Sequence, residues 1–118
     1  MPVMQADLSI ESRGSGGVPV LLVHSIVGNT RHWRAQLDHL ESKRRVAAVD
    51  LSGHGGWPEA AETYSFRRLA DDIGRAADAL GFERFVLVGH SMGAAGAAEY
   101  TATHSERVLA LVLVDAPP

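Results

Sequence analysis

Buried-type apolar runs alternate with helix-like segments along this chain, and this alternation limits the folds it can adopt. The apolar runs occupy residues 18–24, 45–51, 85–89 and 107–115. The segments between them predict helices over residues 29–40, 65–80 and 92–103. Near-continuous apolar runs are typical of strands buried on both faces of a parallel sheet. Three helical crossovers between such strands predict an α/β fold, with a mainly parallel sheet and helices on both faces.

Two further segments add detail to this prediction. Apolar residues recur at spacings of three and four from Phe66 to Leu80, which is the pattern of a helix with one buried face. Gly81 follows at the position where a left-handed residue commonly ends a helix. Residues 5–11 alternate loosely and predict one half-exposed strand ahead of the buried ones.

Composition narrows the class of protein. At 118 residues the chain predicts a single domain over residues 1–118. A net charge of −3 gives no electrostatic basis for binding nucleic acid or an anionic membrane. The chain has no cysteine, no basic and apolar leader, no run long enough to span a bilayer, and no metal or nucleotide motif. We therefore expect a cytoplasmic protein without a metal or cofactor.

The segment Gly89-His90-Ser91-Met92-Gly93 matches the G-x-S-x-G pattern between a predicted strand and a predicted helix. A serine on so tight a turn adopts strained backbone angles, and its neighbours two residues away must lack a Cβ. Gly89 and Gly93 meet that requirement. The exposed amides of a helix N-terminus also favour developing negative charge. Ser91 is the candidate nucleophile, and the alternative is a plain Gly-Ser turn.

Three motifs in this order resemble the first half of the α/β-hydrolase superfamily. They are residues 18–33, residues 46–58 and residues 85–100. The resemblance covers nearly every residue and implies a truncated α/β-hydrolase core that lacks the C-terminal strands and the lid. It also implies that reactive groups collect beyond the carboxyl ends of the strands.

The resemblance implies an oxyanion hole made of two backbone amides. The residue after the nucleophile, Met92, supplies one, and the loop after residues 18–24 supplies the other from Ile26. Ser25 stands where the family usually has glycine, which departs from the pattern. By the same resemblance, His24 braces this loop rather than acting as a base.

The base and the acid that would activate Ser91 are harder to assign than the oxyanion hole. The family order is the serine, then an acid, then a histidine, and no histidine follows His104. Asp115 occupies one position at which family members carry the acid, and it equally could simply end a strand. If a base comes from within the chain, His54 is the first choice, because its loop lies on the catalytic edge. The base histidine is otherwise unassigned.

The apolar run over residues 108–114 has no later strand or helix to cover it. Exposed, flat apolar edges invite pairing with another chain. We therefore expect a homodimer or a larger homo-oligomer joined through residues 108–114. A partner chain could then supply His54 or another histidine across the interface.

These residues predict a serine hydrolase that cleaves small carboxylic esters through an acyl-enzyme intermediate. Serine at position 91 argues against epoxide hydrolase and haloalkane dehalogenase chemistry, for which the resembled family uses aspartate there. The alternative, which the missing histidine supports, is a catalytically inactive half-domain that serves as an assembly or binding module or is a folding fragment.

Overall fold

The computed structural model describes residues 2–5, 8–24, 33–50 and 66–115. The strands in these ranges are β1 (Pro2–Gln5), β2 (Leu8–Arg13), β3 (Val20–Val23), β4 (Val46–Asp50), β5 (Phe85–His90) and β6 (Val108–Val114). The helices are α1 (Arg34–Leu40), α2 (Phe66–Leu80) and α3 (Met92–Thr103). The longest of these helices has 15 residues, and none of them is long and apolar enough to cross a bilayer.

The described strands form one sheet in the order β1-β2-β4-β3-β5-β6. From β4 to β6 all neighbours are parallel, whereas β1 and β2 add an antiparallel hairpin at one edge. The mainly parallel sheet predicted from the sequence is therefore confirmed. The single strand predicted over residues 5–11 is wrong, because Gln5 pairs with Leu8 and the segment belongs to two strands.

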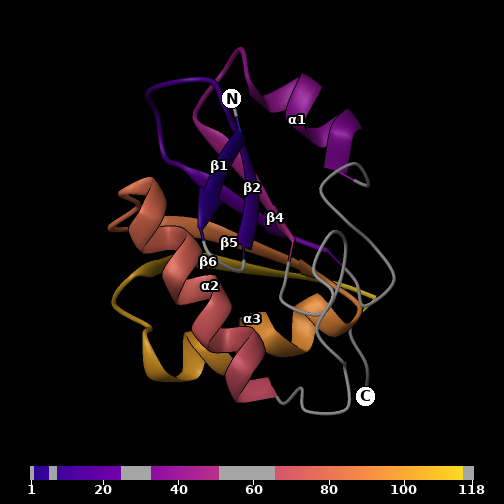
Figure 1. Ribbon diagram of the computed structural model, residues 1–118, viewed down its shortest axis with the longest axis vertical. Coiled ribbons are helices and arrows are strands. Elements are labelled where there is room, and N and C mark those ends of the chain that lie inside the picture. The colour runs from indigo at the N-terminus through magenta and orange to yellow at the C-terminus, as the bar shows by residue number, and fades with distance from the viewer. Residues whose placement is uncertain (1, 6–7, 25–32, 51–65, 116–118) are drawn as a thin grey trace.

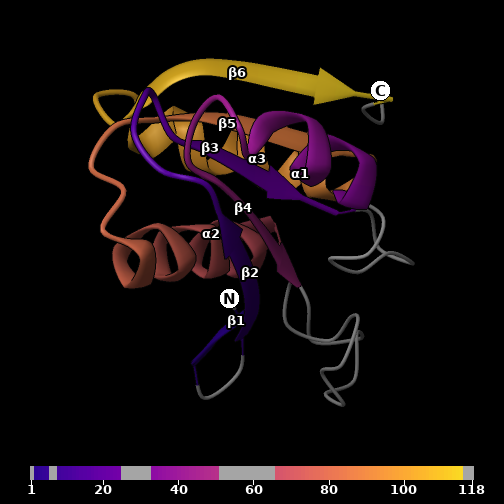
Figure 2. The same cartoon turned by 90° about the horizontal axis from the view of Figure 1, so that it is seen from above.

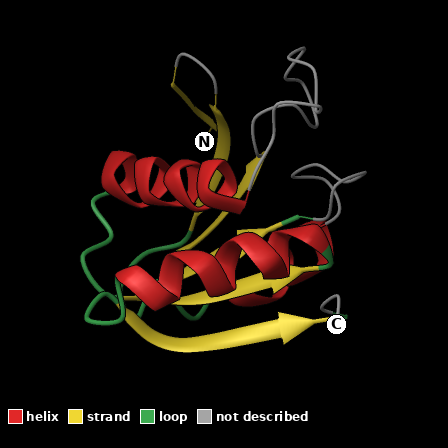
Figure 3. Cartoon of the chain, turned by 90° about the horizontal axis from the view of Figure 1, so that it is seen from below, coloured by secondary structure: helices red, strands yellow, loops and turns green. Residues whose placement is uncertain are grey.

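Helices cover both faces of the sheet, with α1 on one face and α2 and α3 on the other (Figures 2 and 3). Alternate residues of the parallel strands feed two separate cores. On the α1 face, the buried residues are Val20, Leu22, Trp33, Leu37, Val46 and Ala48. On the α2 and α3 face, Leu21, Val23, Ala47, Val49, Phe85 and Leu87 pack beneath the two helices. The prediction of helices on both faces is confirmed.

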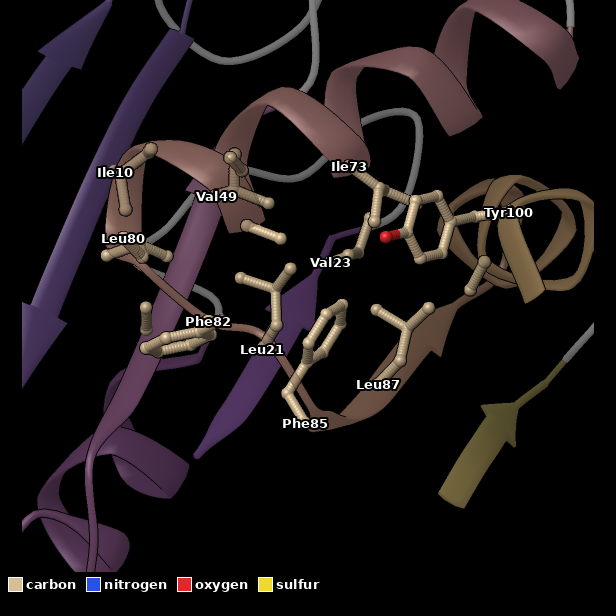
Figure 4. Packing of buried hydrophobic residues seen from close by; sticks show 14 of the residues in the cluster. Ile10, Leu21, Val23, Val49, Ile73, Leu80, Phe82, Phe85, Leu87 and Tyr100 are labelled. Carbon is tan, nitrogen blue, oxygen red and sulfur yellow. The ribbon is translucent and has the colours of Figure 1, made fainter. Parts of the chain in front are cut away.

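The end of α2 shows how local sequence sets the path of the chain (Figure 1). Gly81 has φ 72°, in the left-handed region that costs glycine little. Its N–H donates to Asp78 O at 3.1 Å, and the N–H of Phe82 donates to Ala77 O at 2.9 Å. These two bonds form a Schellman cap. The cap turns Phe82 into the core beside Phe85, from which β5 begins (Figure 4).

Small residues let α2 and α3 approach closely. A Cβ added at Gly96 of α3 would lie 2.7 Å from Leu69 Cβ of α2. On the other helix, a Cβ at Gly74 would lie 3.3 Å from Tyr100 Cε1. The Tyr100 ring fills the space between the helices and the sheet, and its hydroxyl points toward Ile73 and Val23 (Figure 4). Tight packing of this pair fixes α3, and with it the start of α3 at the candidate site.

Strand β6 is last in the sheet order and pairs with β5 alone among the described strands. Val108 and Leu111 of this strand are partly buried against the core, whereas its other side chains are exposed. Leu109 is 53% exposed, and Val112, Leu113 and Val114 are each exposed by more than 40%. The apolar edge predicted over residues 108–114 is thus present, whereas the oligomer expected from it stays a prediction.

Candidate active site

The bend between β5 and α3 holds Ser91 in a backbone conformation that L residues rarely adopt. β5 ends at His90 and α3 begins at Met92, so one residue lies between strand and helix. That residue, Ser91, has φ 57° and ψ −118°. Angles of this kind cost on the order of 1–3 kcal/mol and persist only where the surrounding structure enforces them. The strained bend predicted from the sequence is confirmed, and the catalytic role of Ser91 stays a prediction.

Two glycines make the bend possible by leaving room for backbone. A Cβ added at Gly89 would lie 2.6 Å from Gly93 O and 2.7 Å from Ala94 Cα. A Cβ added at Gly93 would overlap the carbonyl oxygen of His24 and lie 2.8 Å from that of Val23. Real Cβ atoms essentially never come this close to other heavy atoms. The steric reason given for both glycines of the motif is therefore confirmed.

Backbone hydrogen bonds hold Ser91 on both sides. Its N–H donates to Val114 O of β6 at 3.0 Å, which extends the β5–β6 pairing one residue past His90. Its carbonyl oxygen accepts bonds from the N–H groups of Ala94 at 2.9 Å and Ala95 at 3.4 Å. The Ser91 backbone is therefore tied to the neighbouring strand and to the first turn of α3. Its side chain is half-buried and makes no capping hydrogen bond.

Met92 is the first residue of α3, a helix of 12 residues. The amides of Met92 and Gly93 precede the helical bonds that begin at Ala94, so neither has an acceptor within the helix. The N-terminus of a helix also carries a partial positive charge of roughly half an elementary charge. This placement of the Met92 amide beside Ser91 suits the stabilisation of an oxyanion, as the resemblance implies.

The other predicted oxyanion donor, Ile26, lies outside the described residues, as does Ser25. The structure does place the residue that leads into that segment. His24 follows β3 and is 1% exposed, and its carbonyl oxygen lies against Gly93 of the bend. A buried histidine beside the bend fits the bracing role that the sequence indicated for it.

Asp115 follows β6 directly, and the residue before it, Val114, accepts the Ser91 amide bond. Asp115 therefore lies one residue beyond the contact between the two strands. It is exposed and has φ 52°, a conformation that aspartate tolerates better than most residues. Its placement at the carboxyl edge beside Ser91 agrees with the acid position, and its role stays a prediction. His54, the first choice of base, lies outside the described residues.

The histidine next to the nucleophile candidate has a packing role. The His90 imidazole meets the Trp33 indole edge to face, with ring centroids 6.4 Å apart and an interplanar angle of 85°. No local sequence pattern identifies Trp33 as the partner of His90. The two residues are far apart in the chain. Helical spacing indicates that Trp33 shares a face with Leu37, but it does not indicate which strand that face contacts.

The remaining described histidines lie away from the bend. His39 is exposed on α1, and His104 follows the far end of α3. The His104 ring stacks on Tyr100 at 4.4 Å, and its Nδ1 lies 2.9 Å from Thr103 Oγ1 and 3.3 Å from Tyr100 O. The described contacts of His90 and His104 are with Trp33, Tyr100 and Thr103 rather than with Ser91. Within the described ranges, no group of acidic, histidine or cysteine side chains could hold a metal ion.

A hollow of about 310 Å³ lies between α2 and α3. Its walls are Arg67, Ala70, Asp71, Glu99, Thr103 and His104. The α3 residues among them come eight or more positions after Ser91, which is about 12 Å or more along a helix. This hollow is therefore separate from the bend and adds no residue to the candidate site.

Comparison with known proteins fits this geometry. A profile of the alpha/beta hydrolase fold matches residues 18–118. Epoxide hydrolase 3 of Xenopus tropicalis is 36% identical over 100 residues, which cover 83% of this chain and 27% of the relative. The crystal structure of a membrane phospholipase A superposes with a TM-score of 0.85 at 30% identity, covering 99% of this chain and 39% of that one. A thermophilic esterase from Thermogutta terrifontis gives 0.83 at 32% identity, covering 93% and 40%. This chain thus spans less than half the length of each of these proteins.

Proposed function

This chain belongs to the α/β-hydrolase family, and from that premise we propose that it is a serine hydrolase of small carboxylic esters. The observation that carries the proposal is the strained backbone of Ser91, at φ 57° and ψ −118°, where β5 meets the N-terminus of α3. A serine hydroxyl at that point lies beside the first amides of the helix, which have no hydrogen-bond acceptor within it. A plain Gly-Ser turn requires neither the strain nor the two close backbone contacts at Gly89 and Gly93.

The reaction follows from these parts. Ser91 Oγ attacks the ester carbonyl carbon as a base takes the hydroxyl proton, and the tetrahedral oxyanion lies against the amides of Met92 and Ile26. The base returns the proton to the alkoxide oxygen as the carbon–oxygen bond breaks, and the alcohol leaves. A water molecule then attacks the acyl-enzyme by the same route and releases the acid and Ser91.

Asp115 and His54 complete the proposal. Asp115, one residue past the Val114–Ser91 bond, would orient an imidazolium that forms beside the bend. His54 is the proposed base, either from the same chain or from a second copy. Substituting His54 with alanine then lowers ester hydrolysis to background while Asp115→Asn lowers it in part. Unchanged hydrolysis in His54→Ala would remove His54 from the mechanism.

The ester substrate rests on the identity of residue 91 and on the named neighbours. The family uses aspartate at this position for epoxide and haloalkane chemistry, and this chain has serine. Two of the structures it superposes on are named as an esterase and a membrane phospholipase A, and the first of these names supports an ester substrate. The epoxide hydrolase relative supports the family of this chain but does not support the ester substrate.

A fluorophosphonate probe tests the proposal, since it modifies only an activated serine. We expect labelling of the wild-type chain, none of Ser91→Ala, and full labelling of Ser105→Ala. Ser105 is an exposed turn residue after α3 and serves as the matched control. Hydrolysis of p-nitrophenyl acetate should follow the same order, and a long-chain ester compared with it reports acyl preference.

The second candidate function is an inactive half-domain that acts as an assembly or binding module. The observation in its favour is that the rings of His90 and His104 contact Trp33 and Tyr100 rather than Ser91. A chain that is folded by circular dichroism but neither labels nor hydrolyses would support this candidate and exclude the hydrolase.

A further inference from the structure

His90, the residue before the proposed nucleophile, packs against Trp33 immediately ahead of α1. The two rings meet edge to face with centroids 6.4 Å apart. Trp33 is 8% exposed, and its indole Nε1 is buried without a hydrogen-bond partner in the described part of the chain. The indole therefore acts on its surroundings through its shape and its aromatic contact, since its one polar atom has no partner there.

The alternation of β5 explains why this contact forms. Val86, Val88 and His90 are half-buried on the α1 face of the strand, while the residues between them face α2 and α3. Val86 and Val88 pack against the same core that contains Trp33. His90 thus extends the α1-face core to the carboxyl end of β5, and Trp33 covers it there.

The Ser91 bend is then held from three directions. Gly89 packs against the α3 backbone and Gly93 packs against the end of β3, which encloses the bend, and the bond from the Ser91 N–H to Val114 O ties it to β6. The ring of Trp33 holds the side chain of the preceding residue from the α1 face. Strained backbone persists only where its surroundings enforce it, so each of these restraints contributes to the geometry of the bend.

Resting on the proposed role of Ser91, we propose that Trp33 is a positioning residue that acts through His90 to fix the nucleophile and the Met92 amide. A misplacement of about 1 Å can cost on the order of 10²-fold in rate. Loss of the indole leaves substrate contacts in place but loosens the reacting groups. We therefore expect Trp33→Leu to lower kcat by about tenfold or more, with KM little changed.

Four single variants and one double variant of the full chain test this proposal. Trp33→Leu and His90→Leu each remove one ring, and Trp33→Phe keeps an aromatic ring without the indole N–H. Leu37→Ala is the matched control, because Leu37 is fully buried in the same core but carries no ring against His90. Active sites are counted by fluorophosphonate labelling, so that kcat refers to folded, labelled protein alone.

Positioning predicts a specific pattern. Trp33→Leu and His90→Leu lower kcat, the double variant is no slower than either one, and Trp33→Phe restores most of the rate. Leu37→Ala loses stability but keeps kcat per labelled site. Equal kcat per site in Trp33→Leu and Leu37→Ala would overturn the proposal and leave Trp33 a purely structural residue.

A second readout applies even where no hydrolysis is measurable, as happens if the proposed function fails. In native-state hydrogen exchange, the Ser91 amide, which donates to Val114 O, should lose more protection in Trp33→Leu than the variant's loss of global stability explains, and should not do so in Leu37→Ala. Unchanged relative protection of Ser91 in Trp33→Leu would overturn the inference whatever the activity of the wild type. Lost protection in Trp33→Leu with an inactive wild type would support the positioning contact and reject the hydrolase proposal alone.

Discussion

Replacing Gly93 with alanine tests whether lack of space sets the bend at Ser91. The new Cβ would overlap the carbonyl oxygen of His24 and lie 2.8 Å from that of Val23. Both are backbone atoms at the end of β3, a strand bonded on each side by β4 and β5, so they cannot rotate away. Either α3 or β3 must move. Overpacking of this kind costs typically 1–3 kcal/mol and sometimes more, whereas alanine in a helix recovers about 1 kcal/mol.

The net expectation for Gly93→Ala is a free energy of unfolding lower by about 2 kcal/mol, because two backbone carbonyls block the new Cβ and the upper overpacking cost therefore applies, less the gain in helix propensity. Three other glycines supply graded comparisons. Gly89→Ala also meets backbone, at 2.6 Å from Gly93 O, and should cost as much. Gly96→Ala meets a side chain, at 2.7 Å from Leu69 Cβ, and should cost about 1 kcal/mol because α2 can yield.

Gly74→Ala is the matched control of the series. Its Cβ would lie 3.3 Å from Tyr100 Cε1, a contact that a small ring shift relieves, and helix propensity favours alanine. We expect it to be neutral within about 0.5 kcal/mol or slightly stabilising. Urea unfolding followed by far-ultraviolet circular dichroism gives all four values, provided the m-values agree. If Gly93→Ala proves as stable as Gly74→Ala, steric enforcement of the bend is refuted.

Three further predictions follow from the structure. Ser91→Gly should be more stable than Ser91→Ala by about 1 kcal/mol in urea unfolding, because glycine adopts φ 57° without strain; equal stability would mean that the bend stores none. Tyr100→Phe should raise the free energy of unfolding by about 1 kcal/mol, because it removes a buried hydroxyl that has no partner in the described structure. Burial raises the pKa of Tyr100, so the stability that comes from its neutral form is full below about pH 10 and falls as the pH rises through the raised value. The stability advantage of Tyr100→Phe over the wild type should therefore grow above about pH 10, and an advantage that shrinks there would contradict this reasoning. Light scattering should show self-association of the wild type through the 108–114 edge and a monomer for Val112→Lys, and a monomeric wild type would remove the expectation.

The sequence predicted the parallel core well because burial on both faces leaves a simple signature. The runs at 18–24, 45–51, 85–89 and 107–115 contain β3, β4, nearly all of β5 and β6, as a continuous apolar composition requires. The N-terminal hairpin was missed because the sequence shows no clear break between its two strands. The loose alternation over residues 5–11 spans the end of β1 and most of β2, and neither residue between Gln5 and Leu8 is a glycine or an asparagine.

Some features of the site can be predicted from local sequence and others cannot. The bend at Ser91 depends on five consecutive residues, so their spacing alone predicts its strain, its glycines and the helix that follows. The packing of Trp33 on His90 depends on how α1 lies against the end of β5, which no local pattern contains. Asp115 falls between these cases. The strand that carries it was predicted, but its closeness to Ser91 appears only once β5 and β6 are paired.

A hydrogen bond links the bend at Ser91 to the edge strand β6. Ser91 N–H is bonded to Val114 O at the open edge of the sheet, and the β6 side chains there are exposed. An edge strand frays more readily than a central one, because it is bonded on one side only. A partner that covers β6 would therefore also stabilise the hydrogen bond from Ser91 to Val114 and the position of Asp115. Stability of the bend and completeness of the site are then coupled through a single hydrogen bond, so a substitution that frays β6 should slow labelling of Ser91 before it unfolds the core.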